Sequence, residues 1–326
     1  MLYSKEFLEK LYWMMKRIRL CEESLIQPII DGEIRCPVHL YSGEEAIATG
    51  VCAALEKNDF VFGNHRSHGH FLAKGGDMGA MIAEIYGKEA GCSKGRGGSM
   101  HLIDPENRVI GVSPIVAGTI PLATGAALAS KIRKDKNVTV TFFGDGATGE
   151  GGLYEALNFA SLKKLPVIFV CENNLYSTHL PVNEIRVDNK IYEIAKPFNI
   201  QSFNGDGNDV LAVYKIAKKA VNICRNNKGP VFLEFITFRL RGHVGPSDTI
   251  LGNHRDIRPK NLIAEWKKKD PLTIFKKYLI ESENFLEDEI IGIDKLCEAE
   301  VNNANRFARE SEFPDKNDLS KNVFKE

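Results

Sequence analysis

The chain has 326 residues, with 43 basic and 43 acidic side chains, so its formal net charge is zero. This balance gives neither nucleic acid nor an anionic membrane surface an electrostatic reason to bind. The seven cysteines are scattered and odd in number, with no CxxC pair, and neither a signal peptide nor a membrane-spanning apolar run is evident. These features predict reduced thiols in a cytoplasmic protein.

The elements predicted along the chain form one domain with helical ends. Residues 1–35 are expected to form an N-terminal helical arm, residues 36–258 an α/β core, and residues 259–326 a helical region whose last dozen residues are frayed. Apolar, β-branched segments within the core predict strands at 138–143, 166–171 and 231–236. Alternation of such strands with helical patterns predicts a doubly wound, mostly parallel sheet flanked by helices.

Two polar motifs follow neighbouring predicted strands. Gly144-Asp145-Gly146 comes after strand 138–143 and before a helix predicted at 150–164, and Asn173-Asn174 follows strand 166–171. Open α/β sheets bind their ligands at the carboxyl ends of the strands. The pattern therefore places the side chains of Asp145 and Asn174 at a ligand site.

The chemistry of these side chains favours a hard cation beside a phosphate group. A carboxylate and an amide oxygen suit Mg²⁺ or Ca²⁺ better than Zn²⁺ or Cu²⁺. Glycines around Asp145 allow close approach of a diphosphate, which the N–H groups opening the next helix can receive. A Gly-Asp-Gly segment alone is as often an ordinary turn, and the Asn pair after the next strand argues against that interpretation.

The segment GDGATGEGGLYEALNFASLKKLPVIFVCENNLYS resembles the thiamine diphosphate motif in alpha subunits of 2-oxo acid dehydrogenase first components. That family includes the pyruvate, branched-chain 2-oxo acid and acetoin dehydrogenases. The similarity runs from about Leu11 to Leu272 and recurs in VHLYSGEEAIATGVCAAL, HRSHGHFLAKG, GKEAGCSKGRGGSMHL, IVAGTIPLATGAALA and FRLRGHVGPSD. It implies the diphosphate-binding half of the thiamin diphosphate-binding fold.

The resemblance also implies roles for individual residues. Asp145, Asn174 and the backbone carbonyl of Tyr176 would bind Mg²⁺, while His243 and His68 would line the active site as catalytic residues. The cofactor-binding set comprises His65, Arg66, Val116, Asp145, Gly146, Ala147, Asn174, Tyr176, Arg239 and His243.

The cluster His65, His68 and His70 allows a second interpretation. An HxxHxH pattern can supply zinc ligands, although no cysteine or fourth ligand lies nearby. In the family the first of these positions more often carries a Tyr that touches the cofactor. An imidazole there can still donate a hydrogen bond, but it could titrate near neutral pH.

Two other positions depart from the family. Pro114 stands where a Gly usually precedes the Val that meets the aminopyrimidine ring, so position 114 lacks an N–H and has a fixed φ. Val244 stands where animal enzymes carry a regulatory phosphoserine, and the nearby Ser247 is not predicted to replace it. The sequence GPSDTILGNHRDIRP differs from the family and weakens inference about the substrate.

The glycine-rich segment 91–100, GCSKGRGGSM, lacks the spacing of a P-loop or a dinucleotide fingerprint. We expect it to be a tight loop that shapes the site and a subunit contact. The segment IVAGTIPLATGAALA is expected to be a helix whose small residues allow close approach of another subunit.

The resemblance covers only half of a thiamine diphosphate site. It therefore implies an oxidoreductase that acts on a 2-oxo acid or acetoin only with a beta subunit, in an α2β2 heterotetramer. The acyl group would pass to a lipoyl-bearing acyltransferase. The alternatives are a biosynthetic carboligase or ketolase without a lipoyl partner, a non-catalytic scaffold, and a magnesium-dependent phosphohydrolase with Asp145 as nucleophile. The last would call for a second Asp at the position of Ala147.

Overall fold

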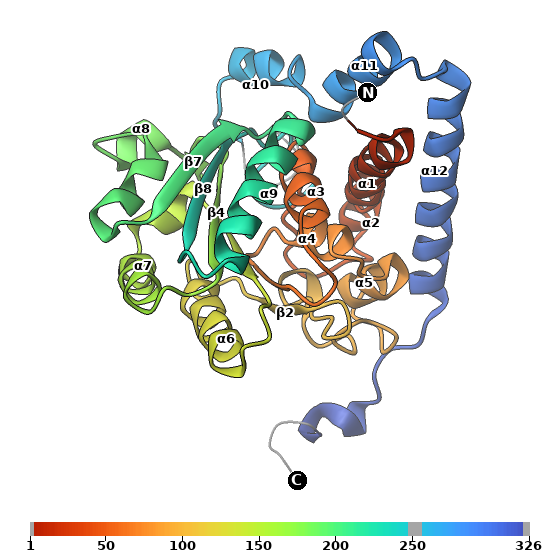
Figure 1. The fold of residues 1–326 in the computed structure, drawn as a ribbon. Helices are drawn as coiled ribbons and strands as arrows, with labels where there is room; N and C mark the ends of the chain where they lie inside the picture. Colours follow the sequence, from red (N-terminus) through yellow and green to blue (C-terminus); the bar gives the residue numbers. More distant parts are fainter. Residues whose placement is uncertain (1–2, 247–255, 322–326) are drawn as a thin grey trace.

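The computed structural model describes residues 3–246 and 256–321. Within them, six strands form one parallel sheet in the order β2-β1-β3-β4-β8-β7, and Figure 1 shows β4, β8 and β7 side by side. The strands are β1 (Phe60–Gly63), β2 (Val109–Val112), β3 (Thr139–Gly144), β4 (Val167–Asn173), β7 (Gln201–Asp206) and β8 (Val231–Ile236). A small antiparallel pair, β5 (Tyr176–Ser177) and β6 (Leu180–Pro181), stands apart from the sheet.

Helices account for most of the remaining structure. The α-helices are α1 (Lys5–Ser24), α2 (Ile26–Ile30), α3 (Glu45–Ala53), α4 (His68–Ala73), α5 (Met78–Ile85), α6 (Thr119–Arg133), α7 (Gly151–Lys163), α8 (Val182–Ile185), α9 (Val210–Arg225), α10 (Lys260–Lys267), α11 (Pro271–Glu283) and α12 (Glu287–Glu310). Short 3₁₀ segments are η1 (Gly98–Met100), η2 (Asp145–Gly149), η3 (Ile191–Phe198) and η4 (Lys316–Ser320). No helix of the described chain is both long enough and apolar enough to span a membrane.

Helices cover both faces of the sheet because its strands are apolar on both sides. Side chains alternate along a strand, so neighbouring residues enter different cores. Phe142 packs with residues of α3 and α9, whereas Phe143 packs with residues of α6 and α7. The predicted doubly wound α/β fold is confirmed, and all six strands of the main sheet are parallel.

The helical ends of the chain lie side by side. Helix α12 runs along α1 in Figure 1, with Arg17 of α1 bound to Glu300 of α12 at 2.8 Å. Arg19 of α1 binds Glu45 at the start of α3 and Asp270, which caps α11. The two terminal regions therefore brace the same side of the core.

The strand order reverses direction next to β1. The chain passes from β1 outward to β2, and β3 then returns to pair with β1 on its other side. The loops after β1 and β3 consequently leave the sheet in opposite directions and open a crevice between them, where doubly wound sheets bind ligands.

The segment after β3 differs from the predicted strand–turn–helix. The 3₁₀ segment η2 occupies Asp145–Gly149, and α7 begins only at Gly151. The N–H groups nearest Asp145 therefore belong to a tight 3₁₀ turn rather than to the first turn of an α-helix.

Candidate functional site

A cavity of about 450 Å³ lies at the carboxyl edge of the sheet, where the strand order reverses. Loops after β1, β2, β3, β4 and β8 all contribute to its wall. Its lining contains every residue of the predicted cofactor-binding set, namely His65, Arg66, Val116, Asp145, Gly146, Ala147, Asn174, Tyr176, Arg239 and His243. Segments up to 178 residues apart, from His65 to His243, thus meet around one space.

Asp145 presents a buried carboxylate to this cavity. The residue is 1% exposed, and its Oδ2 atom has no hydrogen-bond partner in the described structure. Burial raises the pKa of the carboxyl group to about 6. A desolvated carboxylate with a free oxygen gains stability from a cation placed beside it.

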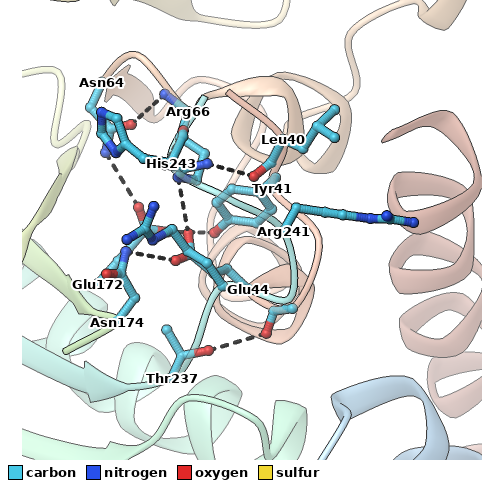
Figure 2. Close-up of polar contacts among 12 residues, drawn as sticks. Leu40, Tyr41, Glu44, Asn64, Arg66, Glu172, Asn174, Thr237, Arg241 and His243 are labelled. Carbon is cyan, nitrogen blue, oxygen red and sulfur yellow. Dashed lines mark hydrogen bonds and ion pairs between the residues drawn. The ribbon is translucent and has the colours of Figure 1, made fainter. Parts of the chain in front are cut away.

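Asn174 is held by a neighbouring carboxylate. Its Nδ2 atom donates to Oε1 of Glu44 at 2.8 Å (Figure 2), and its Oδ1 accepts from the backbone N–H of Tyr176 at 3.3 Å. Burial raises the pKa of Glu44 to about 8, against the opposing influence of Arg66. Because Glu44 accepts from the amide nitrogen, the amide oxygen of Asn174 is left as the group available to a cation.

Two buried arginines give the cavity its positive charge. Arg66 donates to the carbonyl of Leu40 at 2.6 Å and to the carbonyl of His243 at 3.1 Å. Arg239 donates to the carbonyl of Thr178 at 2.9 Å, but its Nε and Nη1 have no partner. Burial, and then Arg66, lower the pKa of Arg239 to about 9. Buried cationic donors without partners suit a doubly charged oxyanion.

Close packing against Ser177 explains why position 146 is a glycine. A Cβ built on Gly146 would lie 2.4 Å from Oγ and 3.1 Å from Cβ of Ser177, so a side chain there would have to displace the side chain of Ser177. Gly144 has more room, since its nearest neighbour would be the carbonyl of Glu172 at 4.0 Å. The backbone of η2 therefore faces the cavity without obstruction from a side chain at position 146.

Three histidines stand together in the wall. The ring centroids of His39 and His65 are 4.6 Å apart, and those of His39 and His243 are 5.0 Å apart. Burial lowers the pKa of His39 to about 2, of His65 to about 3 and of His243 to about 2, and Arg66 adds to each shift. All three imidazoles are therefore neutral at physiological pH.

His68 does not reach the cavity. It begins α4, is fully buried, and bonds Glu22 through Nδ1 and Ser99 through Nε2, both at 2.8 Å. The structure thus places this predicted catalytic residue in a link between α1 and η1, behind the cavity wall. The HxxHxH zinc interpretation fails on the same geometry, because His70 bonds Glu172 instead.

The glycine-rich loop binds a carboxylate of the chain itself. Oε2 of Glu84 accepts from the N–H groups of Ser93 and Gly95, and Oε1 accepts from those of Gly97 and Gly98, at 2.7–3.0 Å. Glu84 is fully buried in this ring of donors. The loop is therefore closed around an internal anion, and it positions Met100 in the cavity wall.

Comparison with known proteins agrees with this arrangement. A family model described as the dehydrogenase E1 component matches residues 13–317. The chain belongs to the dehydrogenase E1 component family. It is an alpha-type chain of the thiamine diphosphate-dependent 2-oxo acid dehydrogenase first components.

Individual relatives match along nearly the whole chain. The alpha subunit of acetoin:2,6-dichlorophenolindophenol oxidoreductase from Bacillus subtilis is 38% identical over 319 residues, covering 97% of this chain and 94% of the relative. A chloroplastic pyruvate dehydrogenase E1 alpha-3 subunit from Arabidopsis thaliana is 38% identical over 330 residues, covering 99% and 76%. The pyruvate dehydrogenase E1 alpha subunit from Rickettsia felis is 35% identical over 321 residues, covering 98% and 97%.

The cavity suits the cofactor of this E1 family. Thiamine diphosphate carries an anionic diphosphate, and the unpartnered atoms of Asp145 and Arg239 are the buried groups that a metal–diphosphate would satisfy. Pro114 and Val116 both line the cavity, so Val116 lies in the wall despite the departure from glycine at position 114.

Several residues of the cavity wall were not predicted from the sequence, among them His39, Glu44 and Glu172. Glu172 accepts from Tyr41 Oη (Figure 2). It also bonds His70 Nε2 at 2.8 Å, so it ties β4 to α4. All three stood inside quoted motifs, as His39 and Glu44 belong to VHLYSGEEA and Glu172 to CENN. For Glu172, the signal available in the sequence was an acidic residue two positions before the predicted ligand Asn174.

Proposed function

We propose that the chain is a single thiamine diphosphate-binding domain that acts as the alpha subunit of a magnesium-dependent 2-oxo acid or acetoin dehydrogenase. One observation carries the proposal. Asp145, Asn174 and Arg239 converge from the ends of three strands on one cavity, and the first and last keep buried polar atoms without partners.

The proposed metal ligands are Asp145, Asn174 and the backbone carbonyl of Tyr176. Carboxylate, amide and carbonyl oxygens are hard donors, and three protein ligands leave positions for phosphate oxygens and water on an octahedral Mg²⁺. Hydrogen bonding of Asn174 Nδ2 to Glu44 supports this assignment, because it directs the amide oxygen rather than the nitrogen toward the cation.

Arg66, Arg239 and the backbone N–H groups of Gly146 and Ala147 are proposed to neutralise the diphosphate. The bound cofactor supplies the electron sink for cleavage of the bond next to a carbonyl. His243, neutral and half-buried at the cavity wall, would accept or return a proton near the reacting carbonyl.

Partners are proposed from the same family. The B. subtilis, A. thaliana and R. felis relatives are each named as alpha subunits. We infer that a beta subunit completes the site in an α2β2 heterotetramer and that a lipoyl-bearing acyltransferase receives the acyl group. The seven free cysteines support the reducing cytoplasm as the compartment.

The test combines the chain with its beta subunit. Acceptor reduction is measured with pyruvate, branched-chain 2-oxo acids and acetoin, with and without thiamine diphosphate and Mg²⁺, and acyl transfer to a lipoyl domain is assayed separately. Cofactor-dependent reduction supports the proposal. Carbon–carbon ligation without acyl transfer would instead identify a carboligase, and no cofactor-dependent turnover on any substrate would refute a catalytic role.

A further inference from the structure

Three histidines from distant segments form a compact nitrogen cluster in the described structure. His39 lies before α3, His65 follows β1, and His243 follows β8. One ring nitrogen of each lies within 4.8 Å of those of the other two. In a tetrahedral zinc site, Zn–N distances of about 2.0–2.1 Å place ligand nitrogens roughly 3.4 Å apart. Small rotations of three rings would therefore bring them to ligating distance.

His39 provides an independent indication of a ligand. Its side chain is 8% exposed, lies in the cavity wall, and has a buried Nδ1 with no hydrogen-bond partner in the described residues. Buried polar nitrogens are normally satisfied, so an unpartnered one on a residue that lines a cavity calls for a group that the cavity receives. A metal ion can accept the lone pair of a neutral imidazole.

The charges around the cluster are mixed. Arg66 and Arg239 repel a cation. The Glu44 carboxyl group lies 3.9 Å from Nε of Arg66 and offsets part of that charge when it is ionised, above its pKa of about 8, and Glu172 shares the same cavity. Burial keeps all three imidazoles deprotonated, which leaves their lone pairs free at neutral pH. Three neutral nitrogens are borderline ligands that select Zn²⁺, Co²⁺, Ni²⁺ or Cu²⁺ over Mg²⁺.

We propose that His39, His65 and His243 form a second metal site, specific for Zn²⁺-class ions, within the cofactor cavity. It differs from the proposed oxygen-ligand site at Asp145, Asn174 and Tyr176 in both residues and metal preference. Three protein ligands leave at least one coordination position open toward the cavity. A bound ion occupies the lone pair of His243, so loading this site suppresses any proton transfer by that residue.

The inference goes beyond the proposed function and does not depend on it. The experiment uses the full chain stripped of metal and cofactor, titrated with Co²⁺ as a spectroscopic substitute for Zn²⁺. We expect the intense visible d–d absorption of four- or five-coordinate Co²⁺, saturating at one ion per chain and bleached by stoichiometric Zn²⁺ but not by excess Mg²⁺.

Variants separate this site from adventitious binding. His65→Tyr and His39→Asn each remove one proposed ligand. Each should weaken Co²⁺ binding by at least about 10- to 100-fold, because changes to outer-shell groups, which only orient the ligands, already have effects of that size. His101→Asn, at an exposed histidine on the surface, should leave the spectrum and affinity unchanged. Circular dichroism checks that each variant is folded.

The metal site and the proposed function are tested by different results. An absent d–d band, or one retained by both folded ligand variants, would overturn the metal site. Because the titration contains no thiamine diphosphate, failure of cofactor binding in the assembled enzyme would refute the proposed function and leave this result unaffected. Loss of turnover on addition of Zn²⁺ to the assembled enzyme then tests whether a bound ion suppresses proton transfer by His243.

Discussion

Oε1 of Glu44 accepts a hydrogen bond from Nδ2 of Asn174 at 2.8 Å, between a loop before α3 and the end of β4. The bond fixes which end of the amide faces the cavity. Outer-shell groups of this kind set the orientation of metal ligands, and their loss typically weakens metal binding by about 10- to 100-fold.

Glu44→Ala is therefore expected to weaken Mg²⁺-dependent binding of thiamine diphosphate by about 10- to 100-fold. Glu44→Gln keeps an acceptor oxygen for Asn174 and should retain most of the affinity. Titration calorimetry on the assembled enzyme measures both. Equal losses in the two variants would mean that the charge of Glu44, rather than orientation of the amide, matters.

Asp145→Ala tests the metal position directly. The carboxylate is buried with a free Oδ2, so removing it deletes one charge-assisted contact worth about 1.5–3 kcal/mol. Magnesium-dependent cofactor affinity should fall by at least about 10- to 150-fold, while the circular dichroism spectrum stays unchanged. Glu298→Ala, at an exposed position on α12, is the control and should bind normally. Unchanged affinity of the Asp145 variant would contradict the assignment.

His243→Ala separates binding from chemistry. Arg66 bonds the backbone carbonyl of His243, and that contact does not need the imidazole. Cofactor affinity should therefore stay close to normal while kcat falls by about 10²- to 10⁴-fold, the range for loss of an acid–base group. Steady-state kinetics and calorimetry on the same preparation provide the two values. Parallel losses in affinity and kcat would make His243 a structural residue of the loop.

The sequence predicted the centre of the sheet better than its edges. Strands β3, β4 and β8 are rich in β-branched, aromatic and other apolar residues, and each lies within two residues of its predicted bounds at either end. Strands β1 and β2 have four residues each, too few for a periodic signal. Strand β7 lies at the sheet edge and reads QSFNGD, which has the composition of a loop.

Site residues could be predicted from the sequence where a motif follows a strand end, because the fold fixes the position of the backbone there. They could not be predicted where the direction of the side chain decides whether it faces the cavity. Asp145 and Asn174 follow strands whose ends must meet, so their convergence follows from the topology. His65 and His68 are three residues apart, yet His65 faces the cavity and His68 faces Glu22 of α1. That difference depends on where α4 begins and how it packs on α1, which local pattern does not specify.

Arg19 provides a stability prediction far from the cavity. Its guanidinium binds both oxygens of Glu45 at 2.5 and 3.1 Å and both oxygens of Asp270 at 2.8 and 3.2 Å, joining α1, α3 and the start of α11. The Glu45 side chain is fully buried. Replacing Arg19 by Met leaves the Glu45 carboxylate without a cationic partner, although the backbone N–H of Gly43 still donates to it. Breaking a buried ion pair in this way typically costs about 3–5 kcal/mol.

The free energy of unfolding of Arg19→Met, from urea denaturation of the assembled enzyme, should fall by about that amount. Lys10→Met is the matched control, because Lys10 pairs with Glu6 on the same helix with both side chains more than two thirds exposed. Such exposed pairs contribute about 0–1 kcal/mol. Arg19→Lys should be intermediate, since an ammonium keeps the charge but cannot bind two carboxylates in the fork geometry of a guanidinium. If Arg19→Met and Lys10→Met lower the free energy of unfolding by the same amount, the arm formed by α1 does not depend on this buried ion pair.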